Sequence, residues 1–179
     1  IIQMDVHVND VEYNYTRVQE LLSQSLSEHP DIIVLPETWN TGFYPSKELI
    51  NIADRNGERT QSLLRTFAKE HNVNIVGGSV AVAKNDVVFN TSYAYNREGT
   101  LVGEYSKMHG FSPAKEDQYF AGGTHTTHFE LDGIPCSTVI CYDIRFPELV
   151  RMAALPNTEL LFVPAQWPTM RLRHWQVLN

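Results

Sequence analysis

The sequence predicts an α/β layered fold, in which helices cover the faces of sheets. Segments with strand-like apolar runs alternate with amphipathic helical segments near both ends of the chain, which is typical of βαβ units. Between them, short strands follow one another through turns that favour antiparallel hairpins. The 179 residues, 42% hydrophobic and 20% charged, are enough for one globular domain over residues 1–179 with its own core.

The N-terminal elements are expected in the order strand, helix, strand. Residues 1–8 alternate as a strand, and residues 11–27 form a helix with one apolar face. Residues 31–35 are a buried strand that Pro36 ends, and residues 37–45 read as a loop. Ser46 and Thr60 are predicted N-caps for helices at 47–54 and 61–71.

The later elements are mostly strands. Segments 74–82, 87–95 and 100–106 are separated by turns short enough for hairpins, and 127–131 and 134–140 flank a further turn. Pro147 is expected in the first turn of a helix, before a strand at 159–163 and a last helix from about Thr169. The chain starts without Met inside an apolar segment, and its last helix has no C-cap signal. We therefore expect a fragment that is clipped slightly at the front and more extensively at the C-terminus.

The charge pattern excludes several classes of function. The formal net charge is −7, and the 14 Lys and Arg residues form no dense basic cluster for nucleic acid or anionic lipid. The longest aliphatic or aromatic runs, at 32–35 and 160–163, are far too short to span a bilayer. The first residues lack the basic region of a signal peptide. We expect a cytoplasmic protein that binds neither nucleic acid nor membrane.

The two cysteines, Cys136 and Cys141, are predicted to be separate thiols. On an extended strand their Cα atoms would lie about 16 Å apart, with the side chains on opposite faces. A disulfide tolerates no more than about 7 Å. Free thiols fit a reducing compartment.

Three positions carry groups that could take part in catalysis. Glu37 follows a buried strand, Lys107 ends a hairpin strand, and Cys141 lies at a strand-to-helix turn. Taken singly, each has an ordinary structural interpretation: a solvated carboxylate, a charge that protects a sheet edge, and a core thiol. Together they supply acyl transfer, with a thiol nucleophile, a carboxylate base and a cation for the developing oxyanion.

These segments resemble the three catalytic motifs of the nitrilase superfamily of carbon–nitrogen hydrolases. Leu35-Pro36-Glu37, Tyr105-x-Lys107-x-His109 and Ile140-Cys141-Tyr142-Asp143-x-Arg145-Phe146-Pro147-Glu148 match in order and spacing. The resemblance implies a Glu37, Lys107 and Cys141 triad, no cofactor, and a four-layer α-β-β-α sandwich, incomplete here at the C-terminus. It also implies a homodimer or higher homo-oligomer of the full-length protein.

The resemblance also covers the segment from Glu116 to Gly122, which would carry a second glutamate that orients Lys107. The Tyr142 N–H would share the oxyanion with Lys107. His109 would form a wall of the pocket. Arg145 is interpreted as a structural partner of Asp143 or Glu148, with substrate contact as the lesser alternative. Four aromatic residues are expected to line the pocket or pack near it, with core packing as an equally good explanation for each: Trp39, Phe43, Tyr119 and Trp167.

The segments around Cys141 and Gln166 look most like bacterial omega-amidases, which hydrolyse the terminal amide of 2-oxoglutaramate and related 2-oxo acids. True nitrilases usually have Trp-Glu where this chain has Tyr142-Asp143. Amidohydrolases of N-carbamoyl amines share much of the same motif and remain an alternative. A catalytically dead chain that serves only as a binding or assembly module is the non-enzyme alternative.

Other chemistries fit less well. His125, His128 and Glu130 are metal-ligand types, but on a strand only the last two share a face, so no metal site is predicted. Only three residues separate Cys141 from Arg145, too few for the phosphate loop of a tyrosine phosphatase. A papain-like Cys-His pair with His109 or His174 lacks a group to orient the imidazole.

Overall fold

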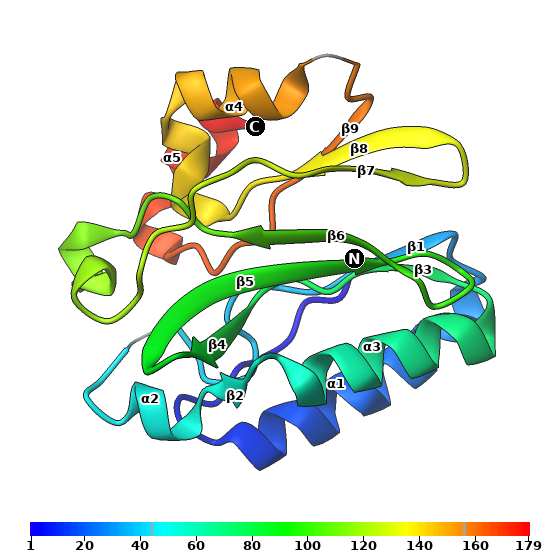
Figure 1. Cartoon of the computed structure of the whole chain (residues 1–179), viewed down its shortest axis with the longest axis horizontal. Coiled ribbons are helices and arrows are strands. Elements are labelled where there is room, and N and C mark those ends of the chain that lie inside the picture. Colours follow the sequence, from blue (N-terminus) through cyan, green and yellow to red (C-terminus); the bar gives the residue numbers. More distant parts are fainter. Residues whose placement is uncertain (44, 156) are drawn as a thin grey trace.

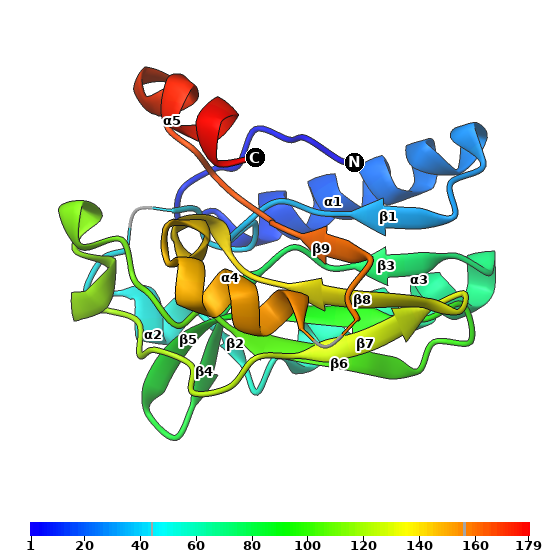
Figure 2. The ribbon, with the colours of Figure 1, turned by 90° about the horizontal axis from the view of Figure 1, so that it is seen from above.

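The computed structural model describes residues 1–43, 45–155 and 157–179. Figure 1 shows four layers: helices α1 and α3, the sheet that contains β5, the sheet that contains β8, and helices α4 and α5. The strands of both sheets run in roughly one direction (Figure 2), as in aligned sheet packing. The predicted α-β-β-α order is therefore confirmed.

The bounds of the elements are as follows. The helices are α1 (Val11–Ser25), α2 (Leu49–Ile52), α3 (Glu58–His71), α4 (Pro147–Ala154) and α5 (Leu172–Leu178). The first sheet contains β1 (Ile32–Val34), β2 (Asp54–Arg55), β3 (Asn74–Val76), β4 (Val80–Lys84), β5 (Val87–Tyr95) and β6 (Leu101–Ser106). The second contains β7 (His128–Leu131), β8 (Ile134–Thr138) and β9 (Leu160–Phe162). Short 3₁₀ helices span Leu26–Glu28, Ser112–Ala114, Glu116–Gln118, Cys141–Arg145 and Thr169–Arg171.

Strand β5 organises the first sheet. The order is β1-β3-β5-β4-β2, and β6 pairs with the other edge of β5. β1 is parallel to β3 and β2 is parallel to β4, whereas β5 is antiparallel to β3, β4 and β6. In the second sheet β7 and β8 form a hairpin, and β9 is parallel to β8. The predicted hairpins β4–β5, β5–β6 and β7–β8 are confirmed.

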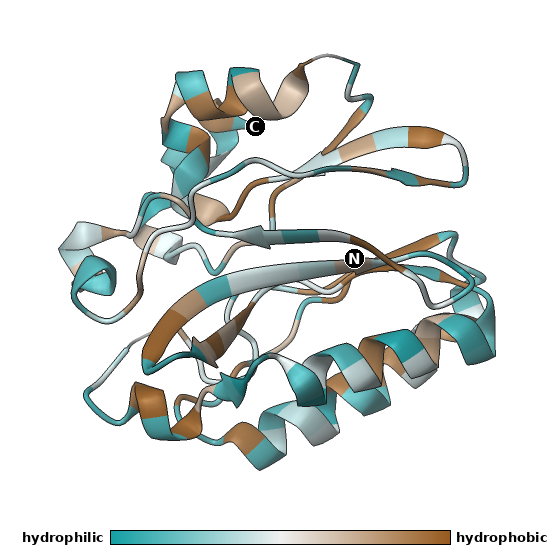
Figure 3. Cartoon of the chain, in the orientation of Figure 1, coloured by the Kyte–Doolittle hydropathy of each residue, from teal (hydrophilic) through white to brown (hydrophobic). Residues whose placement is uncertain are grey.

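Helices α1 and α3 pack on the first sheet through one apolar face each. Tyr15, Val18 and Leu22 of α1 and Leu64 and Phe67 of α3 belong to one buried cluster. Figure 3 shows hydrophobic and hydrophilic residues alternating along both helices, as amphipathic helices require. None of the helices within the described ranges is long and apolar enough to cross a membrane.

Two predicted strands differ from the structure. Residues 1–8 form no strand, and one backbone hydrogen bond, from Ile2 N to Val34 O at 2.9 Å, holds their start against β1. The segment 74–82 is two strands, β3 and β4, because the chain bends at Gly77 and Gly78. Gly78 has φ +62°, and a Cβ there would lie 2.0 Å from the carbonyl oxygen of Pro36.

Two predicted helices also differ. α2 is confined to Leu49–Ile52, and α3 begins at Glu58 rather than after Thr60. The missed strand β2 explains the earlier start of α3, because the Asp54 carboxylate accepts hydrogen bonds from the N–H groups of Arg59 at 3.2 Å and Thr60 at 2.8 Å. A carboxylate outside the helix thereby caps its first turn.

Candidate active site

Glu37 is held at the end of β1 by the bend between β3 and β4. The Ser79 hydroxyl accepts a hydrogen bond from Thr38 N at 3.0 Å, and the Trp39 indole donates to Gly77 O at 2.9 Å. The Glu37 side chain is fully buried. Because a carboxylate in such a place must be paired or hydrogen-bonded, its partners define the site.

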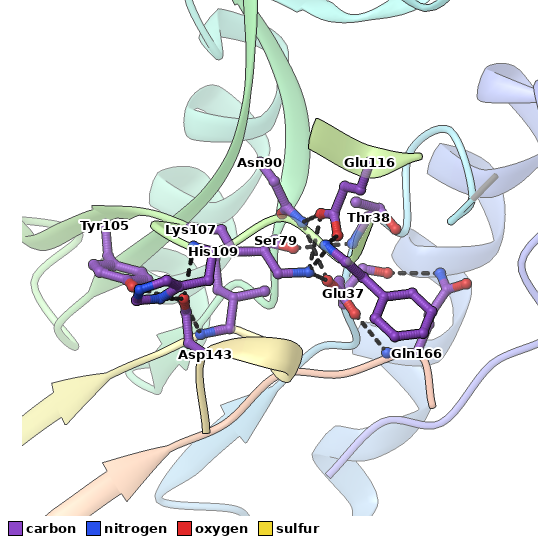
Figure 4. Close-up of polar contacts among 12 residues, drawn as sticks. Glu37, Thr38, Ser79, Asn90, Tyr105, Lys107, His109, Glu116, Asp143 and Gln166 are labelled. Carbon is purple, nitrogen blue, oxygen red and sulfur yellow. Dashed lines mark hydrogen bonds and ion pairs between the residues drawn. The ribbon is translucent and has the colours of Figure 1, made fainter. Parts of the chain in front are cut away.

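The partner is Lys107, which follows β6. Lys107 N donates to Asn90 O at 2.9 Å, and Gly123 N donates to Lys107 O at 2.8 Å. The Lys107 ammonium lies 2.8 Å from Glu37 Oε1, and 2.9 and 2.8 Å from Oε1 and Oε2 of Glu116. All three charged side chains are buried. Figure 4 shows that they converge from three separate segments.

The carboxylates of Glu37 and Glu116 both raise the pKa of Lys107. Burial alone lowers the pKa of the Lys107 ammonium, but the negative charges of Glu37 and Glu116, and that of Cys141 when it is ionised, outweigh burial and raise that pKa. Lys107 is therefore a fixed cation. Both carboxylate oxygens of Glu116 contact the Lys107 ammonium, and Phe111 N donates to Glu116 Oε2 at 2.7 Å.

Two amide residues in the cluster were not predicted as site residues. Asn90 of β5 donates from Nδ2 to Glu37 Oε1 and to Glu116 Oε1, each at 3.1 Å. Gln166 donates from its backbone N–H to Glu37 Oε2 at 2.9 Å and from Nε2 to Glu37 O at 2.6 Å. The available signal for Asn90 was a polar amide inside a strand, where asparagine is depleted.

Cys141 lies against this cluster at the first position of a 3₁₀ helix. Strand β8 ends at Thr138, two residues before the predicted end of the strand 134–140, and Cys141 lies on the predicted turn between that strand and α4. Its φ is +47°, a left-handed conformation, and its N–H donates to Pro164 O at 2.9 Å. Cys136 and Cys141 are both free, as predicted.

The Cys141 thiol is buried close to Glu37 and Lys107, whose charges act on it. Burial raises the pKa of the thiol most, the charge of Glu37 raises it further, and Lys107 lowers it only in part. With one cation between two carboxylates, a thiolate would add a second net negative charge to a buried site. The resting group is the neutral thiol.

Asp143 joins the turn of Cys141 to strand β6. Its buried carboxylate accepts hydrogen bonds from the Tyr105 hydroxyl at 2.7 Å and Ile140 N at 3.1 Å. It also lies 3.0 Å from His109 N and 2.9 Å from His109 Nδ1. Figure 4 shows this second network beside the charged one. His109 stacks on Phe146 with ring centroids 3.6 Å apart, so Asp143 and Phe146 orient the imidazole, and the expectation that no group orients His109 is wrong.

The predicted outer residues divide into two groups. Phe43 faces Lys107, with Nζ 5.8 Å from the ring centroid, and Trp167 packs in the cluster that contains Cys141. Tyr119 does not join the site: it packs beside α2, against the cluster that contains Leu49, so the core-packing alternative holds and a place in the pocket does not.

Arg145 does not pair with Asp143 or Glu148, so the structural interpretation is wrong. Its guanidinium carbon lies 5.8 Å from the ring centroid of Tyr142 and 5.6 Å from that of Trp167. Its buried Nε and Nη2 have no hydrogen-bond partner within the described residues. A cation near Tyr142 and Trp167, with donors that no described residue uses, is suited to an anionic group.

The part of the chain that the structure describes contains no group of three or more His, Cys, Asp or Glu side chains arranged to hold a metal ion. His109 Nδ1 pairs with Asp143 Oδ1 at 2.9 Å.

The fold and site together define a class of protein. A four-layer α/β sandwich brings a buried thiol, a carboxylate and an ammonium to one place, and acyl-transfer enzymes use these groups. The chain belongs to the carbon–nitrogen hydrolase family, whose model matches residues 1–179, and thus to the nitrilase superfamily.

Known relatives agree with this membership. The chain is 42% identical over 177 residues to a 2-oxoglutaramate amidase of Bacillus subtilis, covering 99% of this chain and 68% of that protein. It is 36% identical over 180 residues to a hydrolase in the agr operon of Staphylococcus aureus, covering 99% and 69% respectively. Among solved structures, a superfamily protein from Xanthomonas campestris with an arsenic adduct in its active site superposes with a TM-score of 0.87 at 29% identity, over 99% of this chain and 68% of that one.

Proposed function

We propose that the chain hydrolyses the terminal amide of a small 2-oxo acid through a thioester on Cys141. The observation that carries the proposal is the buried Glu37–Lys107–Glu116 cluster facing the Cys141 thiol. Attack by sulfur on the amide carbon requires the thiol proton to leave, and Glu37 is the nearby carboxylate that can accept it. Because the thiol is neutral at rest, proton transfer accompanies formation of the C–S bond.

The tetrahedral oxyanion then needs donors. Lys107 is a fixed cation at the site, and the Tyr142 N–H lies in the first turn of the 3₁₀ helix that starts at Cys141. Glu116 anchors Lys107 through two contacts, so the ammonium is held in place rather than recruited. Collapse of the intermediate breaks the C–N bond, and ammonia leaves with the proton that Glu37 had accepted.

The second half regenerates the thiol. Glu37, again a carboxylate, takes a proton from water as the water oxygen attacks the thioester carbon. A second oxyanion forms at the same donors, the C–S bond breaks, and sulfur recovers the proton from Glu37. The product forms as a carboxylic acid, which gives its proton to ammonia or water on release and becomes the carboxylate. Until that release, Glu37 carries each transferred proton.

The substrate class rests on Arg145 and on similarity. The unpartnered Nε and Nη2 of Arg145, between Tyr142 and Trp167, suit a carboxylate at the far end of the substrate. Similarity to a 2-oxoglutaramate amidase supports a substrate with an amide at one end and a 2-oxo acid at the other. Arg145→Gln is expected to raise KM for 2-oxoglutaramate at least tenfold, and to leave a neutral amide substrate unaffected.

The decisive test compares the two cysteines. Cys141→Ala is expected to abolish ammonia release from 2-oxoglutaramate, whereas Cys136→Ala, at a buried thiol of β8 outside the site, is expected to retain it. Mass spectrometry should detect an acyl adduct on Cys141 in the parent protein. Wild-type ammonia release by Cys141→Ala would disprove the mechanism. Release of carbon dioxide from N-carbamoyl amines, with no release of ammonia from 2-oxo amides, would reassign the substrate class.

A further inference from the structure

We propose that Asn90 is a positioning residue that lets two ionised carboxylates, Glu37 and Glu116, share one ammonium, Lys107. This inference rests on the proposed function only in taking Glu37 as the base for Cys141. Asn90 lies in the middle of β5, is 1% exposed, and contacts all three charged residues.

The contacts of Asn90 use both ends of the residue. Its Nδ2 group has two hydrogens, and these point to Glu37 Oε1 and Glu116 Oε1, each at 3.1 Å. Its backbone oxygen accepts the hydrogen bond from Lys107 N at 2.9 Å. Asn90 thus positions Glu37 and Glu116 through its side chain, and the backbone of Lys107 through its own backbone oxygen.

The charges explain why a neutral double donor is needed here. The titratable groups that face one another in the cluster are Glu37, Glu116, Lys107 and Cys141. Two buried carboxylates next to one ammonium repel each other, and a proton shared between them would relieve the repulsion. Two further N–H donors stabilise both anions without adding a charge. Glu37 then stays available to receive the thiol proton.

The side-chain amide of Asn90 can donate to both carboxylates in only one of its two orientations. A flipped side chain would place the amide oxygen against two carboxylate oxygens, which also lack a hydrogen to donate. In the observed orientation Asn90 Oδ1 is buried with no hydrogen-bond partner within the described residues. An unsatisfied buried oxygen is costly, so the two bonds to the carboxylates outweigh that cost. A residue chosen for packing alone would be apolar at this place.

The test measures the reactivity of Cys141 toward iodoacetamide as a function of pH, so it needs no amide substrate. Asn90→Asp replaces both donors by acceptors with little change of shape. The acid limb is the pH at which alkylation of Cys141 becomes half-maximal. In Asn90→Asp this pH is expected to be about one unit higher than in the parent protein, equivalent to ~1.4 kcal/mol. Peptide mapping separates Cys141 from Cys136.

The matched control is Asn74→Asp. Asn74 is also a buried strand amide that donates to a carboxylate, Asp132, at 2.8 Å, but outside the site. Its substitution is expected to lower the melting temperature and leave the acid limb unchanged. A general loss of packing would affect both variants alike, so the difference between them isolates the effect on the charged cluster.

The outcomes are distinct. If Asn90→Asp does not fold, Asn90→Ser, which keeps one donor, should show a smaller shift in the same direction. An unchanged acid limb in a folded Asn90 variant, or no acid limb in the parent protein, would overturn the inference. If the parent shows the limb and the expected shift but hydrolyses none of the tested amides, the proposed function fails while the role of Asn90 stands.

Discussion

Asp143→Asn tests the network that joins the Cys141 turn to strand β6. The substitution keeps the shape of the side chain but converts one acceptor oxygen into a donor. Each carboxylate oxygen now accepts from one backbone N–H: Oδ1 from His109 and Oδ2 from Ile140. In either orientation of the new amide, one buried N–H therefore faces another donor.

The magnitude follows from these contacts. An orphaned buried N–H costs about 1–3 kcal/mol, and the remaining hydrogen bonds lose the strength that comes from a charged acceptor. We expect a loss of roughly 4 kcal/mol in the free energy of unfolding, a shift of about 2 M in the urea midpoint for a slope near 2 kcal/mol/M. Because a misplacement of about 1 Å can cost 10²-fold in rate, alkylation of Cys141 should slow at least tenfold.

The control for this prediction is Asp132→Asn. Asp132 also accepts several hydrogen bonds, from Arg97 and Asn74, but its side chain is 38% exposed, and water can replace what is lost. Its substitution should cost less than about 1 kcal/mol. Urea unfolding measures the loss of stability in Asp143→Asn and in Asp132→Asn. If Asp143→Asn costs no more than Asp132→Asn and leaves alkylation of Cys141 unchanged, the positioning role of Asp143 is refuted.

Three further results are expected. Gly78→Ala should destabilise the chain by roughly 3 kcal/mol or more, since the left-handed backbone and the Pro36 carbonyl leave no room for a Cβ. Gly133→Ala, with open space around it, should cost about 1 kcal/mol. Thermal unfolding would measure both losses of stability, and equal losses would contradict this account. Lys107→Ala should lower kcat for amide hydrolysis about 10²–10³-fold by removing an oxyanion donor, and a loss below about tenfold would assign Lys107 another role. In an ultraviolet pH titration, the Cys141 thiolate should appear only above the pH range of a free cysteine, because burial and the Glu37 charge raise the pKa of the thiol. Glu37→Gln should lower the pH at which the thiolate appears. A higher pH in that variant would contradict the proposed effect of the Glu37 charge.

Periodicity predicted the elements that depend on local pattern. The amphipathic face of α1 and the hairpins of β5 follow from spacing alone. The break between β3 and β4 did not, because the apolar run continues across Gly77 and Gly78, and only the approach of Pro36 explains the bend. The start of α3 was also missed, because Asp54 caps it from outside the helix.

The site residues also divide into those that a local sequence motif predicts and those that it does not. Glu37, Lys107 and Cys141 stand out because their segments resemble known motifs, and the structure brings them together. Asn90 and Gln166 contact Glu37 from positions 53 and 129 residues away in the sequence. No local pattern encodes such contacts. They arise from the order of strands in the sheet, which periodicity leaves undetermined.

The register of one hairpin links the fold to the charges of the site. Asn85 and Asp86 both have positive φ, as a two-residue turn between twisted strands requires, and this turn sets Ala81 opposite Asn90. Ala81 is in turn fixed by the side chain of Asn40, which bonds both its N–H and its carbonyl. Because successive side chains on a strand point to opposite faces, a slip of one residue would turn Asn90 away from Glu37. The hydrogen bonding of the buried carboxylates therefore depends on a tight turn at the far end of β4 and β5, and not only on the residues that touch them.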